Sequence, residues 1–228
     1  MTEPLPHDAL NEAMLAEIAL GALLLAEPLG RDHFDERVIA AMRATPRHDF
    51  VPPAMRPYAH LLRPLEIGHG KTVASPMLVA LMTDLLRVGP EHTVLEIGTG
   101  LGYHAAVVSQ LAGSVVSMEV VEPLAGQAAQ RLVRAGRRNV EVVVGNGAQG
   151  LPGRAPFDRI LVTCAPEIIP PALIRQLRPG GRMVVPAGLD GAQMLMLVTR
   201  ADDGRVAVRD ILPVGFGAME GQAEALFS

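Results

Sequence analysis

The stretch TVLEIGTGLGYHAAVVSQLAGSVVSME, Thr93 to Glu119, decides the fold of this chain. An apolar run, Val94 to Ile97, leads into a glycine-rich turn, Gly98 to Gly102. A segment of helical character then returns to a second apolar run, Val115 to Met118, which Glu119 follows. This order predicts a strand, a tight turn, a helix, a second strand and an acid at its end. A turn this short needs backbone angles that glycine reaches at low cost, and it leaves bare backbone where a ligand can come close. The stretch therefore predicts a site for a nucleotide-type cofactor.

The spacing around the glycines favours one cofactor over another. Glu119 is placed to accept hydrogen bonds from both ribose hydroxyls of an adenosine. The dinucleotide fingerprint G-x-G-x-x-G presents a helix N-terminus to a pyrophosphate, whereas Gly98, Gly100 and Gly102 follow a G-x-G-x-G spacing, with Glu96 two residues earlier. A carboxylate there would repel a pyrophosphate but suits the ammonium group of S-adenosylmethionine, directly or through water. S-adenosylmethionine is the predicted cofactor, and NAD stays as the weaker alternative.

The composition indicates a globular protein of one α/β domain with a small addition. Of the 228 residues 49% are hydrophobic and 19% charged, and the formal charge of −4 gives no electrostatic footprint for nucleic acid. The single cysteine, Cys164, excludes an internal disulfide and a cysteine zinc cluster. No group of His, Asp or Glu has metal-ligand spacing along the chain. We expect a cytoplasmic protein without a metal.

An apolar run near the N-terminus, Met14 to Ala26, raises the question of a membrane segment. It falls short of the ~20 residues that cross a bilayer, and the residues before it lack the positive charge of a signal peptide. We expect a buried or partner-facing helix without membrane contact, ended by Pro28 and Gly30. Its uniform apolarity leaves a homodimer contact open.

Elsewhere helical and strand patterns alternate. Ser75-Pro76 opens a helix to Leu86, because serine favours the N-cap and proline the first helical position. Pro57 to Ser75 shows no sustained period and is expected to be an irregular, functional loop. Further helices are predicted at 32–42, 123–136 and 171–177, and strands at 140–144, 158–163, 182–186, 194–199 and 206–212. The alternation predicts an α/β fold with a mostly parallel twisted sheet, a C-terminal antiparallel hairpin and N-terminal helices.

Several segments resemble the protein-L-isoaspartate O-methyltransferase family. The glycine motif alone marks the methyltransferase superfamily, whereas ERVIAAMRATPRHDFVP (Glu36 to Pro52) and RPLEIGHGKT (Arg63 to Thr72) are more particular. The likeness extends from about Arg31 to Gly221 and includes NVEVVVGNGAQG, FDRILVT and LIRQLRPGGRMVVPAG. It implies a Rossmann-like methyltransferase fold. We accordingly divide the chain into residues 1–75, N-terminal helices with the acceptor-site loop, and residues 76–228, a core that binds S-adenosylmethionine.

The resemblance also implies a set of residues around the cofactor. The ribose would lie on Glu119 and the adenine beside Asn146, where the family has aspartate; the side-chain oxygen of asparagine still supplies an acceptor for the adenine amino group. Tyr103 is expected to pack over the amino-acid end. The full set is Glu96, Gly98, Thr99, Gly100, Gly102, Tyr103, Glu119, Asn146 and Gly147.

The acceptor half departs further from the family. The family's substrate-facing serine aligns with Ala74, and Ser75, its neighbour, points to the other side of an extended chain. Lys71, Thr72 and Ser75 are the candidates for orienting the acceptor, together with His69. For Ser75 a plain N-cap is the alternative, and for the others an ordinary polar loop.

The implied reaction is methylation of a carboxylate in a peptide or protein, with L-isoaspartyl residues as the leading substrate and protein repair as the purpose. A carboxylate is already ionised at neutral pH, so positioning suffices and no general base is required. Two alternatives stay open. One is a divergent relative that methylates an aspartate or another nucleophile of a dedicated peptide or small molecule; the other is a module that binds S-adenosylmethionine without turnover.

Overall fold

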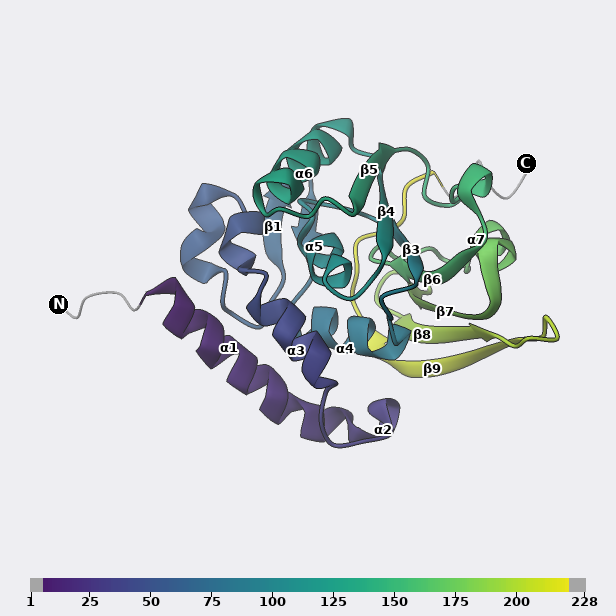
Figure 1. Ribbon diagram of the computed structural model, residues 1–228, viewed down its shortest axis with the longest axis horizontal. Helices are drawn as coiled ribbons and strands as arrows, with labels where there is room; N and C mark the ends of the chain where they lie inside the picture. The colour runs from purple at the N-terminus through teal and green to yellow at the C-terminus, as the bar shows by residue number, and fades with distance from the viewer. Residues whose placement is uncertain (1–5, 222–228) are drawn as a thin grey trace.

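The computed structural model describes residues 6–221 and is built on one seven-stranded sheet (Figure 1). The strand order is β5-β4-β3-β6-β7-β8-β9, with β3 to β7 parallel and with β8 and β9 added antiparallel. The predicted α/β class, parallel sheet and C-terminal hairpin are confirmed. The bounds are β3 (Thr93–Ile97), β4 (Ser114–Glu119), β5 (Val140–Val144), β6 (Phe157–Val162), β7 (Leu177–Ala187), β8 (Gln193–Arg200) and β9 (Val206–Val214).

Helices cover both faces of the sheet because successive strand residues point to opposite sides. Val94 of β3 packs in the same cluster as residues of α1, α3, α4, α5 and α6, whereas its neighbour Leu95 packs with Leu173 of α7 on the other face. In Figure 1, α1 and α3 lie outside α4, away from the strands. The helices are α1 (His7–Gly21), α2 (Ala26–Leu29), α3 (Glu36–Arg43), α4 (Pro76–Leu86), α5 (Tyr103–Ser109), α6 (Glu122–Arg134) and α7 (Pro171–Gln176).

The stretch from Pro57 to Ser75 is more regular than predicted. It contains a separate antiparallel pair, β1 (Leu65–Gly68) and β2 (Lys71–Val73). Gly68, His69 and Gly70 turn the chain with φ of 92°, 53° and 67°. The expectation of an irregular loop was wrong here, because strands of four and three residues are too short to show a period of two.

The N-terminal helical run is longer than the apolar run that predicted it. α1, the 3₁₀ turn Ala22–Leu25 and α2 follow one another without a break, and the chain leaves the helix at Gly30 with φ of 72°. Pro28 lies inside α2 and does not end it. The run His7–Leu29 has 23 residues and is long and apolar enough to cross a membrane by length and composition alone. The expectation that it is too short was wrong, although Met14 and Ile18 pack into the core.

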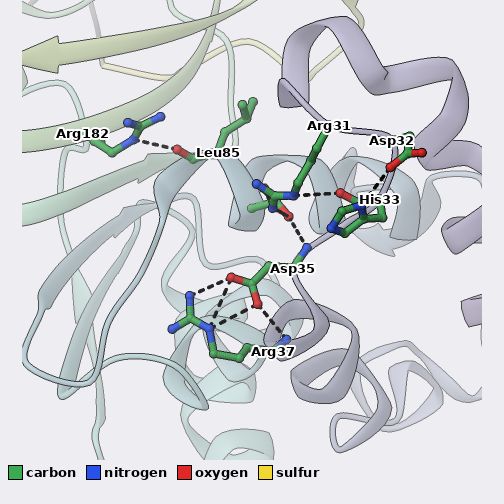
Figure 2. A network of polar contacts seen from close by, with 8 residues as sticks. Arg31, Asp32, His33, Asp35, Arg37, Leu85 and Arg182 are labelled. Carbon is green, nitrogen blue, oxygen red and sulfur yellow. Dashed lines mark hydrogen bonds and ion pairs between the residues drawn. The ribbon is translucent and has the colours of Figure 1, made fainter.

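A buried carboxylate joins the N-terminal segment to α4. Both oxygens of Asp84 lie 2.7 Å from an Arg31 guanidinium nitrogen, and one of them also accepts the Asp35 backbone N–H at 2.7 Å. Figure 2 shows this network, with Arg182 donating to the Leu85 carbonyl at 2.8 Å nearby. Asp35 is also the N-cap of α3, accepting the Arg37 N–H at 2.9 Å. The cap explains why α3 begins at Glu36, later than the predicted residue 32.

We predict that Asp84→Ala lowers the free energy of unfolding by about 2 kcal/mol, because it leaves the Asp35 N–H and the Arg31 guanidinium without their acceptor. Arg37→Ala is the matched control, since the Arg37–Asp35 ion pair is solvent-exposed and contributes less than about 0.5 kcal/mol. Urea unfolding measures both. An equal loss of unfolding free energy in the two variants would contradict the role of Asp84 as a buried acceptor.

Candidate active site

A cavity of about 430 Å³ opens at the carboxyl end of β3. β3 lies between β4 and β6 in the sheet. The strand order reverses at this point, so the loops after β3 and β6 run to opposite sides and leave a crevice between them. The volume lies within the roughly 300–1,000 Å³ range of small-molecule sites. The walls come from the glycine turn, the loops after β4, β5 and β6, the β1–β2 pair with the residues after it, and residues 215–220.

The glycine turn presents bare backbone to this cavity. Gly98, Gly100 and Gly102 have φ of 93°, 57° and 90°, a region of backbone angles that residues other than glycine rarely adopt. A Cβ at Gly98 would lie 2.5 Å from Thr163 Oγ1, and one at Gly100 would lie 3.0 Å from Ile67 Cδ1. Gly98, Thr99 and Gly100 line the cavity, whereas Gly102 faces Leu132 of α6 and allows close packing of α6 there.

Glu119 stands on the cavity wall with its carboxylate fixed by the backbone. One oxygen accepts the Gly100 N–H at 2.8 Å and the other accepts the Val121 N–H at 3.0 Å. Each carboxylate oxygen keeps a further lone pair for a hydroxyl donor. The group is therefore held in place to recognise a diol.

Glu96 lies behind the wall and not on it. It is 1% exposed, the Ser117 hydroxyl donates to it, and Ser117 Oγ lies 2.6 Å from Thr99 Oγ1, so it reaches the cavity only through these two residues. Burial raises the pKa of Glu96 to about 8, the Glu119 charge adds to the rise, and the Ser117 hydrogen bond opposes it. The side chain therefore holds a proton at neutral pH. Among described residues its second oxygen has no hydrogen-bond partner.

The loop after β5 contributes Gly145 and Gly147 to the wall. A Cβ at Gly147 would lie 2.2 Å from Ile97 Cγ2, so the close packing of this loop against β3 also requires glycine. The Asn146 side chain is turned away from the cavity: its amide nitrogen donates to the Gly221 carbonyl at 3.0 Å, and its oxygen accepts the Ala148 N–H at 3.0 Å. In this conformation its main contact is with the C-terminal segment.

Of the predicted acceptor residues, Lys71, Thr72 and Ser75 all line the cavity, and Ala74 lies among them. Lys71 Nζ forms an ion pair with the Glu220 carboxylate. Ser75 caps α4, its hydroxyl oxygen accepting the Leu78 N–H at 3.3 Å, so its predicted N-cap role is confirmed. His69 is not with them, because it lies in the turn between β1 and β2 beside a separate, more open depression.

A buried arginine that sequence reasoning missed organises this side of the cavity. Arg47 is fully buried and donates to backbone carbonyls of Ala59 at 2.9 Å, Leu61 at 3.4 Å, Arg63 at 3.1 Å and Ala74 at 2.9 Å. Burial lowers the pKa of Arg47 to about 10, which leaves it charged at neutral pH. No periodicity distinguishes such an arginine from a surface one.

The C-terminal segment 215–221 was also missed as part of the site. The Gln193 amide pairs with the Phe216 backbone through bonds of 2.9 and 2.6 Å, and Ala165 exchanges backbone bonds of 2.8 Å with Gly217 and Met219. These contacts hold residues 215–220 against the cavity. Because these contacts link positions far apart in the sequence, no local sequence pattern predicts them.

The remaining wall residues offer neither a reactive base nor a nucleophile. Burial raises the pKa of the Cys164 thiol and of Tyr103 to about 12 each. Burial lowers the pKa of His104 to about 3, and its Nε2 lies 2.9 Å from Thr83 Oγ1. The three side chains are neutral at physiological pH, so the site is suited to holding reactants in position.

We predict a pH signature for Glu96. Its pKa in the folded protein is raised from 4.5 to about 8, so its contribution to stability is complete below 4.5 and is lost as the pH rises through 8. The stability of the wild type should therefore fall relative to Glu96→Gln across that interval. Urea unfolding of both proteins at a series of pH values gives the difference, in which the shared titration of His104 cancels. Parallel curves would contradict a protonated Glu96.

Comparison with known proteins agrees with this geometry. A family profile described as protein-L-isoaspartate(D-aspartate) O-methyltransferase matches residues 25–224. A protein-L-isoaspartate O-methyltransferase 1 of Polaromonas sp. is 50% identical over 220 residues, covering 96% of this chain and 93% of its own. A second enzyme of that organism, protein-L-isoaspartate O-methyltransferase 2, is 54% identical over 194 residues, covering 85% of this chain and 92% of its own.

Solved structures share the architecture. One protein-L-isoaspartate O-methyltransferase superposes with a TM-score of 0.78 at 27% identity, over 93% of this chain and 66% of that one. A Plasmodium falciparum protein described as a putative member of the same class, in complex with S-adenosyl-L-homocysteine, gives 0.77 at 19% identity, over 95% of this chain and 99% of that one.

Proposed function

Because this chain belongs to the protein-L-isoaspartate(D-aspartate) O-methyltransferase family, we propose roles for the two halves of the cavity in that family's reaction. The protein is an S-adenosylmethionine-dependent methyltransferase that acts on the carboxylate of L-isoaspartyl residues in proteins, as in protein repair. The observation that carries this conclusion is the family match over residues 25–224, which spans the glycine turn, the β1–β2 pair and the C-terminal segment together.

The cofactor half fits S-adenosylmethionine. When bound, this cofactor supplies a methyl group on a positively charged sulfur. We assign the ribose hydroxyls to Glu119, whose carboxylate is oriented by two backbone donors. We assign the part next to the ribose to the bare backbone at Gly98 and Gly100, and the adenine to that at Gly145 and Gly147, because all four glycines line the cavity. Glu96 supports the turn through Ser117 and Thr99.

The acceptor half is assigned to the edge formed by Lys71, Thr72 and Ser75. The Lys71 ammonium is paired with Glu220 through one oxygen, so two of its three N–H donors remain for an acceptor carboxylate, and the Thr72 and Ser75 hydroxyls are donors beside it. Ala74 supplies no hydroxyl where the family carries serine, so orientation here depends more on Lys71. We keep the division proposed from the sequence: residues 1–75 supply most of the acceptor half and residues 76–228 the cofactor half.

The chemistry that these residues perform is positioning. The acceptor carboxylate is ionised at neutral pH and needs no base, in keeping with the neutral Cys164 and His104. Holding it in line with the methyl group and excluding water can lower the barrier by up to about 7–11 kcal/mol. Leu78, Phe216 and Met219 line the cavity and exclude water.

The acceptor assignment predicts that an isoaspartyl peptide is methylated while its normal aspartyl counterpart is not, and that Lys71→Met lowers kcat/KM for the peptide. The expected loss is about 10- to 100-fold, because a charge-assisted hydrogen bond is worth about 1.5–3 kcal/mol. Lys71→Arg is the matched control and should retain most of the activity. Methyl incorporation measures turnover, and calorimetry with S-adenosylhomocysteine should give the same affinity for all three proteins.

Three outcomes would contradict this assignment. Equal methylation of both peptides would favour an acceptor other than isoaspartate. Tight cofactor binding with neither peptide methylated would favour the divergent relative or the binding module. If Lys71→Met weakened cofactor binding instead of peptide turnover, Lys71 would belong to the other half of the site.

We also propose a homodimer through the N-terminal helices and a cytoplasmic location. Leu20, Leu23 and Leu24 are 68%, 60% and 90% exposed, which is unusual for large apolar side chains. Sedimentation of the wild type against Leu24→Glu tests the contact, and a monomeric wild type would refute it.

The single cysteine is consistent with a reducing compartment, and cell fractionation tests the location.

A further inference from the structure

Three histidines that lie far apart in the sequence meet on the N-terminal side of the molecule. His7 is the first residue of α1, His48 lies in the 3₁₀ turn Arg47–Phe50, and His60 follows the 3₁₀ turn Pro53–Tyr58. One potential ligand atom from each residue lies within 4.8 Å of the other two. The His7 and His48 rings are stacked, with centroids 4.0 Å apart, and the His60 ring lies 5.4 and 5.7 Å from them.

The ring nitrogens of this cluster are poorly satisfied. Both nitrogens of His60 and Nδ1 of His48 are shielded from solvent, and none has a hydrogen-bond partner among residues 6–221. Buried polar atoms without partners are uncommon in native proteins, and each calls for an explanation such as a ligand. Two neighbouring rings that each keep a shielded nitrogen without a partner point to a shared ligand.

The two shielded histidines of the cluster, His48 and His60, carry free lone pairs at neutral pH. Burial lowers the pKa of His60 to about 4, helped by the charges of His48, His7 and Arg47. Burial also lowers the pKa of His48; Asp49, 3.6 Å from its Nε2, and Asp8 oppose the shift, while His7 and Arg56 add to it. Neutral imidazoles are the form that binds metals.

We propose that His7, His48 and His60 together bind one divalent transition-metal ion, Zn²⁺ being the best match for three imidazole ligands. Such ions take Zn–N distances of about 2.0–2.1 Å in tetrahedral geometry, with a fourth position left for water or another ligand. The rings must draw closer and the stacked pair must tilt to reach that geometry. His7, exposed at the start of α1, has the freedom to do so.

This site is separate from the methyltransferase cavity, whose lining includes none of the three histidines. Its effect is structural: the ion ties the start of α1 to the segment that carries Arg47. Arg47 in turn holds the carbonyls of Ala59, Arg63 and Ala74 next to the acceptor edge. Bound metal should therefore stabilise the N-terminal part of the protein.

The test uses the full-length, untagged protein after treatment with a chelator. Zn²⁺ is titrated in competition with a chromophoric chelator, and thermal unfolding is followed with and without the ion. We expect one equivalent of Zn²⁺ and an increase in Tm on adding it. His7→Ala and His60→Ala should each weaken the affinity at least tenfold and abolish the Tm increase, while the exposed His33→Ala should behave as the wild type.

Because His60 is shielded, its variant could fold poorly, and His7→Ala keeps the test decisive. His7 is exposed, so the metal-free variant should unfold at the same temperature as the metal-free wild type and differ only when Zn²⁺ is added. Substituted Co²⁺ should give the intense visible absorption of a tetrahedral site in the wild type alone. Equal Zn²⁺ affinity in wild type and His7→Ala, or an equal loss in His33→Ala, would overturn the proposal.

Discussion

The close approach of Gly98 to Thr163 at the carboxyl end of β3 is the constraint on which the site depends. The Thr163 hydroxyl donates to the carbonyls of Gly98 at 2.6 Å and Ile97 at 3.0 Å, so the loop after β6 is bonded directly to the turn after β3. The Gly98 N–H donates to Met118 at 2.8 Å, which bonds the same turn to β4. One turn is thus bonded to both neighbouring strands. No side chain fits at Gly98, and the backbone that faces the cavity stays bare.

The acceptor side obtains its order from a different source. The hairpin of β1 and β2 is a two-stranded unit that would be only marginally stable alone. The buried guanidinium of Arg47 bonds to the carbonyls of Arg63 and Ala74, which flank the hairpin on either side, and to those of Ala59 and Leu61 before it, so it fixes both ends of the hairpin. The Lys71–Glu220 ion pair then joins β2 to the C-terminal segment. A cofactor half fixed by the sheet faces an acceptor half fixed by side chains.

The sequence predicts the first half better than the second, for a physical reason. Strand, glycine turn and acid lie within 27 residues of chain, so spacing alone places Gly98, Gly100 and Glu119 around one cavity. Contacts that join distant segments leave no such trace: Arg47 under the acceptor loop, Gln193 holding Phe216, and the three clustered histidines were found only in the structure. Glu96 shows the intermediate case, since its position follows from the motif but its burial behind Ser117 and Thr99 does not.

The central claim is that Glu119 and the bare turn together bind the adenosine of the cofactor. Isothermal titration of S-adenosylhomocysteine into the wild type and Glu119→Gln tests it most directly, because the substitution preserves shape and removes the charge that receives the ribose hydroxyls. Charge-assisted hydrogen bonds of about 1.5–3 kcal/mol predict an affinity about 10- to 100-fold weaker in the variant. An unchanged dissociation constant, or a wild type that does not bind S-adenosylhomocysteine, would contradict the account.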